Sequence, residues 1–240
     1  MDSGLYERGS APFRASGKAL CMWSWAILGF AEQLEFFKAL EKSAHAKTIS
    51  AARKSFLHAA QATADFYLEN CCTDGIPMWD TGAPNLHHLG DYLNKQSDPF
   101  NDWEPVDSSA AAIAAQGFVR LGNYLGKAKG SRYLRAGLTV AATLFDTPYL
   151  SEDVKHQGLL LHSVYHRPNG WDYIPPGQKV PNGESSMWGD YHGFAFRGFW
   201  FLAEHFKNPL KPIYMDFGLL QMLFDSALEL GRGGLFGHIR

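Results

Sequence analysis

Hydrophobic side chains recur every three to four residues in six separate stretches of this chain, which is the spacing that buries one face of an α-helix. In the first stretch the pattern is carried by Ile27, Phe30 and Leu34, and in the second by Phe56 and Tyr67. The predicted helices span residues 20–42, 48–69, 107–126, 132–145, 189–206 and 212–230. The pattern offers one exception, a short strand over residues 159–165. We therefore expect an all-α fold.

Two long segments, residues 71–106 and 147–184, separate the predicted helices and contain Pro and Gly too often for regular structure. Connections of this length in a compact domain are usually functional. Residues 1–18 show no periodicity and are expected to be a disordered leader, while residues 231–240 should form a frayed tail. The expected organisation is one domain over residues 19–230.

A Gly-Phe pair stands in the middle of three of the predicted helices, at Gly29, Gly117 and Gly198. Glycine is disfavoured inside a helix unless close packing needs it, so matching positions indicate a structural repeat of helix, outer helix and long loop. Helical hairpins repeated in this way are typical of an α/α toroid, in which thin inner helices line a cavity. Three hairpins predict a partial (α/α)6 barrel with the Gly-Phe helices on the inner layer.

Composition and charge exclude several classes of partner. The 240 residues are 46% hydrophobic and 14% aromatic, enough for one sizeable core, and the net charge of -2 leaves no basic patch for nucleic acid or an anionic membrane. The longest apolar run, residues 25–30, is far below membrane-spanning length. The three cysteines have neither a disulfide framework nor metal-ligand spacing, so we expect a cytoplasmic protein without a cofactor.

The stretch from Asp102 to Gly122 combines a helix start, a small-residue face and polar side chains. Pro105 cannot continue an earlier helix, and Asp107 offers side-chain oxygens to the free amides of the next turn. The alanines that follow allow a neighbouring backbone or a ligand to approach closely. This stretch is interpreted either as an ordinary capped core helix or as the wall of a binding site.

Three segments, DGIPMWDTG (Asp74–Gly82), DSSAAAIAAQGF (Asp107–Phe118) and ESSMWGDYHGF (Glu184–Phe194), resemble in this order the C-terminal half of glycoside hydrolase family 88, the unsaturated glucuronyl hydrolases. The related unsaturated rhamnogalacturonyl hydrolases share that architecture. The resemblance implies an α6/α6 barrel with an aromatic, polar pocket for a disaccharide whose non-reducing sugar is a 4,5-unsaturated uronic acid. In that family an aspartic acid drives hydration of the double bond, and the glycosidic bond then opens.

The chain departs from the family pattern in two respects. The family's aspartates lie upstream of everything matched here, so the resemblance implies that this chain lacks the catalytic acid. The match begins at Trp25 after an unrelated leader, so we expect a truncated or misjoined chain. The family's W-x-R-G-Q-A-W motif is also lost before Trp25, which alone survives. The departing positions are Ala19, Cys21, Met22, Trp23 and Ser24, and Cys21 stands where the family has an arginine.

Several side chains are candidates for substrate binding, each with a structural alternative. Trp25 could stack on a sugar or belong to the core. Ser185 and Ser186 match the family's paired serines, which contact the sugar on the reducing-end side, and they also suit a helix N-cap. Trp188 and Asp190 fit loop anchoring better than catalysis.

The candidates for other chemistry are weaker. Asp107 fits capping, although Asp107 with Asp190 is the only carboxylate pair available for direct acid/base hydrolysis. His162 and His166 have metal-ligand spacing but no third ligand at a motif distance, so no metal site is expected. His87 and His88 carry no further information.

Two classes of function remain open. The first is a hydrolase of unsaturated glucuronyl oligosaccharides in polysaccharide degradation, acting on an unsaturated uronyl disaccharide or oligosaccharide. The second is a non-catalytic saccharide-binding or remnant protein of the same fold. Because three hairpins leave two open barrel edges, a homodimer that covers these edges is a further expectation.

Overall fold

The computed structural model describes residues 20–40 and 46–195, and the regular secondary structure of this part is helical. Its long helices are α1 (Leu20–Ala39), α2 (Ala46–Glu69) and α3 (Ser108–Leu144), and its short 3-10 turns are η2 (Leu86–Leu89), η3 (Tyr92–Asn94) and η4 (Arg167–Asn169). Residues 187–195 are again helical. The predicted strand over residues 159–165 is wrong, since that segment contributes only an isolated bridge from Leu160 to Leu150.

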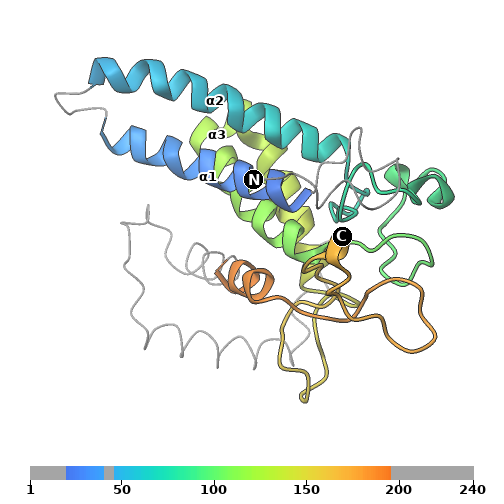
Figure 1. Ribbon diagram of the computed structural model, residues 1–240. Helices are drawn as coiled ribbons and strands as arrows, with labels where there is room; N and C mark the ends of the chain where they lie inside the picture. Colours follow the sequence, from blue (N-terminus) through green and yellow to red (C-terminus); the bar gives the residue numbers. More distant parts are fainter. Residues whose placement is uncertain (1–19, 41–45, 196–240) are drawn as a thin grey trace, which may run out of the picture. The chain divides into compact units, whose positions relative to one another are not determined.

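Helices α1 and α2 form the first hairpin and lie side by side (Figure 1). The predicted apolar faces of both helices are buried, with Ile27 and Leu34 on α1 and Ala60 and Tyr67 on α2 fully enclosed. They share one core with α3, where the rings of Tyr67 and Phe118 meet edge to face at 5.3 Å. The first hairpin therefore has the predicted boundaries within a few residues.

Helix α3 is itself a hairpin, because its backbone breaks at Gly126 (φ 74°, ψ 175°). The predicted end of the helix near Gly126 is confirmed, whereas the turn predicted for residues 127–131 is wrong, since the second half of α3 is helical directly after this glycine. The two halves approach so closely that a Cβ on Gly130 would lie 1.9 Å from the carbonyl oxygen of Gly122. Only glycine fits there, and the second hairpin depends on it.

The first half of α3 packs directly on α1. A Cβ on Gly117 would lie 2.7 Å from Cγ2 of Ile27 and 2.8 Å from the amide nitrogen of Leu28, so this glycine has the close-packing role that the repeat predicted. Gly29 does not, since a Cβ added there would meet no described heavy atom within 4 Å. Gly198 and the helix predicted at 212–230 lie outside the described residues, as do the leader and tail.

The two long loops gather at the end of the bundle where α1 begins and α2 ends (Figure 1). Ile76, Val106 and Tyr149 from these loops pack with Ala111 and Ala115 of α3 in a second core. The described part therefore has the all-α hairpin architecture of a partial α/α toroid, with its loops fixed around the start of α3. Among the helices of this part, none has both the length and the apolar character that crossing a membrane requires.

Candidate functional site

Asp107 caps the N-terminus of α3 from a buried position, as the sequence predicted. Its Oδ1 accepts hydrogen bonds from the amides of Ser109 (3.0 Å) and Ala110 (3.2 Å) and from the Ser109 hydroxyl (2.6 Å). The amide of Val164 donates a longer bond of 3.4 Å to the same oxygen. Burial raises the pKa of the Asp107 carboxyl, while these hydrogen bonds work in the opposite direction. This carboxylate is thus tied to the backbone at the centre of the loops.

Serine side chains connect this helix start to the loops around it. The hydroxyls of Ser108 and Ser163 lie 3.1 Å apart, and the amide of Ser163 donates to the carbonyl of Glu184. The Ser109 hydroxyl accepts from the indole N–H of Trp188 at 3.2 Å. The segment that contains Ser185 and Ser186 is therefore held against the start of α3.

The helical stretch 187–195 begins with a second cap, because the Ser186 hydroxyl accepts from the amide of Gly189 at 3.1 Å. Asp190 on this stretch accepts from the amides of Leu159 (3.0 Å) and Leu160 (2.7 Å). Asp190 therefore has the loop-anchoring position that the sequence favoured. Backbone amides therefore donate to Oδ1 of Asp107 and to both carboxylate oxygens of Asp190.

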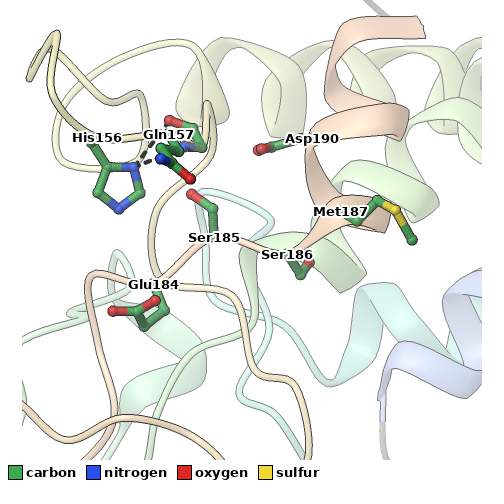
Figure 2. A pocket seen from close by; sticks show the side chains of 8 residues that line it. His156, Gln157, Glu184, Ser185, Ser186, Met187 and Asp190 are labelled. Atoms are coloured by element: carbon green, nitrogen blue, oxygen red, sulfur yellow. Dashed lines mark hydrogen bonds between the residues drawn. The ribbon is translucent and has the colours of Figure 1, made fainter.

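Ser185 and Ser186 line an open pocket of about 270 Å³. Its other lining residues are His156, Gln157, Gly158, Glu184, Met187 and Asp190 (Figure 2). The Ser185 hydroxyl is buried and has no hydrogen-bond partner in the described part of the chain. Neither Trp25 nor the loop Asp74–Gly82 is among these lining residues. The predicted binding residues therefore divide between this pocket and a second surface.

That second surface, here called the aromatic row, combines two groups of aromatic rings, Trp25 with His192 and Trp188 with Tyr165 and Trp171. Trp25 on α1 meets His192 edge to face at 4.9 Å. Tyr165 stacks on Trp188 at 5.3 Å and 24°, and on Trp171 at 5.9 Å and 26°. Trp25, Tyr165 and Trp171 are 46%, 57% and 61% exposed. Large aromatic surface therefore remains available to a ligand.

The pocket and the aromatic row lie on different sides of the helical stretch 187–195. Trp188 and His192 are four residues apart and so share one side of the helix, whereas Met187 and Asp190 share another. His192 is fixed by Gln116 of α3, whose side-chain amide donates to the His192 carbonyl at 2.7 Å. Burial lowers the pKa of His192, so its ring stays neutral at neutral pH.

Two further sequence candidates, the Cys21 thiol and the His162 ring, are restricted by their surroundings in the folded protein. Burial raises the pKa of the Cys21 thiol to about 12, with a further contribution from Asp107. Cys21 is therefore uncharged and cannot pair with a carboxylate. Nδ1 of His162 accepts a hydrogen bond from the Gly183 amide at 3.0 Å, and Nε2 lies 3.1 Å from the Pro148 carbonyl oxygen. Backbone groups therefore occupy both ring nitrogens.

The sequence reasoning missed Tyr165 and Trp171. The segment YHRPNGW contains the signal, because two aromatic residues flank a Pro-Asn-Gly turn that can bring them together. Sequence spacing alone did not show that Trp188, from another segment, would complete the stack.

The protein has the fold of part of the unsaturated glucuronyl hydrolases. The Bacillus sp. GL1 enzyme, described as responsible for the degradation of glycosaminoglycan, matches with a TM-score of 0.50 and 22% identity over 74% of this chain and 37% of that chain. An unsaturated glucuronyl hydrolase specific for heparin matches with a TM-score of 0.51 and 19% identity over 74% and 38%. A Streptococcus agalactiae variant complexed with dGlcA-GalNAc6S matches with a TM-score of 0.50 and 19% identity over 74% and 37%.

This chain thus spans well under half the length of these solved structures. No protein-family model matches its sequence, and no curated protein does.

Proposed function

We propose that this chain forms a saccharide-binding wall of an unsaturated glucuronyl hydrolase type of barrel and takes part in the degradation of polysaccharides. The observation that carries the proposal is the aromatic row beside the capped start of α3. Sugar rings present apolar C–H faces and polar edges, and sites for such ligands combine aromatic surface with a few fixed polar groups. The shared fold supports the same assignment.

The ligand proposed is an unsaturated uronyl disaccharide or oligosaccharide. Trp25 and Trp188 would contact ring faces, and Ser185 and Ser186 would contact hydroxyls. Ser185 and Ser186 support this assignment because both line the open pocket. A cytoplasmic location belongs to the proposal, since Cys21, Cys71 and Cys72 are all free thiols.

The reaction proposed for the complete enzyme is hydration of the 4,5 double bond, followed by release of the uronic acid. A general acid contributes about 10² to 10⁴ in rate. Asp107 and Asp190 are already committed to backbone amides, which favours an acid located elsewhere. This observation also favours the second candidate function, a non-catalytic saccharide-binding protein of the same fold.

Calorimetric titration with an unsaturated chondroitin disaccharide tests the binding proposal. We expect measurable binding by the wild-type chain and a loss of at least fivefold in affinity for Trp25→Ala. The matched control is Trp103→Ala, since Trp103 is also partly exposed but stacks on His88 outside the aromatic row. Absence of binding by the wild-type chain would contradict the proposal.

The absorbance of the conjugated double bond tests activity in the same samples. We expect little or no loss of absorbance for this chain alone, because Asp107 is buried and Asp190 accepts from two backbone amides. Loss at a normal enzymatic rate would contradict the assignment of the acid elsewhere and the non-catalytic alternative. Light scattering after size-exclusion chromatography tests the proposed homodimer, for which a stable monomer is the contrary result.

A further inference from the structure

The loop from Tyr165 to Asp172 carries two exposed aromatic rings and is held in one conformation by its own hydrogen bonds. The Asp172 carboxylate accepts from the amides of Tyr165 (2.5 Å) and His166 (3.1 Å). The ring of His166 accepts from the amide of Asn169, and the loop closes at Gly170 in the left-handed conformation (φ 66°, ψ 31°). The loop is therefore ordered before any ligand arrives, which lowers the entropic cost of binding.

The base of this loop is joined to the proposed binding wall. Tyr165 lies between Trp171 and Trp188, with ring planes within 26° of parallel on both sides. Trp188 is in turn fixed by its hydrogen bond to Ser109 at the start of α3. Trp171 is thus the outer ring of a stack whose inner ring belongs to the proposed site, and it is the most exposed of the three.

Arg167 adds a positive charge to the same loop. Its side chain is half-buried and makes no ion pair with any described residue, whereas Arg120 and Arg132 both pair with carboxylates on neighbouring helices. A guanidinium is suited to bind a carboxylate or sulfate group. An aromatic ring and an unpaired arginine on one preordered loop fit a sugar ring that carries an acidic group.

The geometry points to a distal saccharide subsite at Trp171, with Arg167 as the residue that binds an acidic substituent of the sugar. This inference rests on the proposed function, since it adds a further sugar position to the same wall. The ligand class is an acidic oligosaccharide longer than a disaccharide. Its first two sugars occupy the inner part of the wall, and a later sugar reaches Trp171.

Calorimetric titration with two probes tests the subsite: an unsaturated chondroitin disaccharide and the corresponding unsaturated tetrasaccharide. For Trp171→Ala we expect the affinity for the tetrasaccharide to fall about tenfold and the affinity for the disaccharide to stay within twofold. Trp171→Phe should retain most of the tetrasaccharide affinity, because an aromatic face remains. Trp103→Ala is the matched control and should change neither affinity.

The contribution of Arg167 is measured with Arg167→Gln, against Arg135→Gln on the exposed side of α3 as the control. Arg167→Gln should weaken tetrasaccharide binding severalfold and reduce its dependence on salt concentration, while the control leaves both unchanged. Far-UV circular dichroism confirms that each variant keeps its helices.

The outcomes separate the two proposals. If the wild-type chain binds both probes and Trp171→Ala lowers the affinity for both equally or for neither, the distal subsite is refuted while the proposed function stands. If the wild-type chain binds the two probes with equal affinity, the tetrasaccharide gains nothing from Trp171 and the subsite is again refuted. If the wild-type chain binds neither probe, the proposed function itself is refuted.

Discussion

Replacing His162 should remove a specific part of the protein's dependence on pH. His162 joins the two ends of the long segment 147–184, since Nδ1 accepts from the Gly183 amide and Nε2–H donates to the Pro148 carbonyl. Only the neutral ring can do both, and burial lowers the pKa of His162 from 6.5 to about 4. The test variant is His162→Asn, because His162 has φ 66° and asparagine tolerates that left-handed conformation better than most residues.

The direction in which stability changes with pH follows from proton binding by the unfolded chain. Above pH 6.5 the ring is neutral in both states, and its full contribution to stability is present. As the pH falls from 6.5 towards 4, His162 is protonated in the unfolded chain but stays neutral in the folded protein. The free energy of unfolding therefore decreases. The two pKa values give a loss of about 2 kcal/mol at pH 5 and about 3 kcal/mol once the pH is below 4.

Urea unfolding at pH 7.5 and pH 5.0 measures this loss. His162→Asn should be less stable than wild type by about 1–3 kcal/mol at pH 7.5, because the two backbone groups lose their partner. The difference between the two proteins should then shrink by about 2 kcal/mol at pH 5.0, since the variant has no imidazole to protonate. His58→Asn on the exposed side of α2 is the control and should follow wild type. Parallel pH dependence of wild type and His162→Asn would refute the reasoning.

Three further predictions concern the scaffold of the site. Gly117→Ala should destabilise the protein by about 1–3 kcal/mol in urea unfolding, because the added Cβ meets the α1 backbone. Gly29→Ala should be neutral or stabilise the protein by about 0.5–1 kcal/mol. Equal effects of the two substitutions would contradict the packing described. Asp107→Ala should lower the free energy of unfolding by about 1–2 kcal/mol through loss of the α3 cap, with a smaller loss for Asp107→Asn. Identical melting curves for wild type and both variants would show that the cap contributes nothing. Asp190→Ala should speed hydrogen exchange at the amides of Leu159 and Leu160, and unchanged protection there would mean that other contacts hold the loop.

The sequence by itself determined the helical framework in the described residues. Periodic apolar positions such as Ile27, Leu34 and Tyr67 predicted the buried faces of α1 and α2, because helix geometry is local and repeats every few residues. Asp107 predicted the start of α3 for an equally local reason, since a capping carboxylate reaches amides only two or three positions away.

The sequence was less successful where a contact joins distant segments. It predicted a loop of several residues between the halves of α3, whereas Gly126 alone makes the break and the close approach of Gly122 to Gly130 fixes the hairpin. It also assigned Gly29 the same packing role as Gly117, and only the position of α1 against α3 separates the two. Steric contacts of this kind depend on how helices lie in space, which local periodicity does not encode.

Tertiary structure alone decided how the candidate site is arranged. The sequence predicted both Ser185 and Trp25 as substrate-binding residues, yet the pocket that contains Ser185 and the aromatic row that contains Trp25 lie on different sides of the helical stretch 187–195. Tyr165 stacks on Trp188, and Trp188 is held by its hydrogen bond to Ser109, a residue 79 positions earlier in the chain. The direction in which each side chain points is set by the helix rotation and by hydrogen bonds between segments far apart in the chain, so the shared surface exists only in the folded protein.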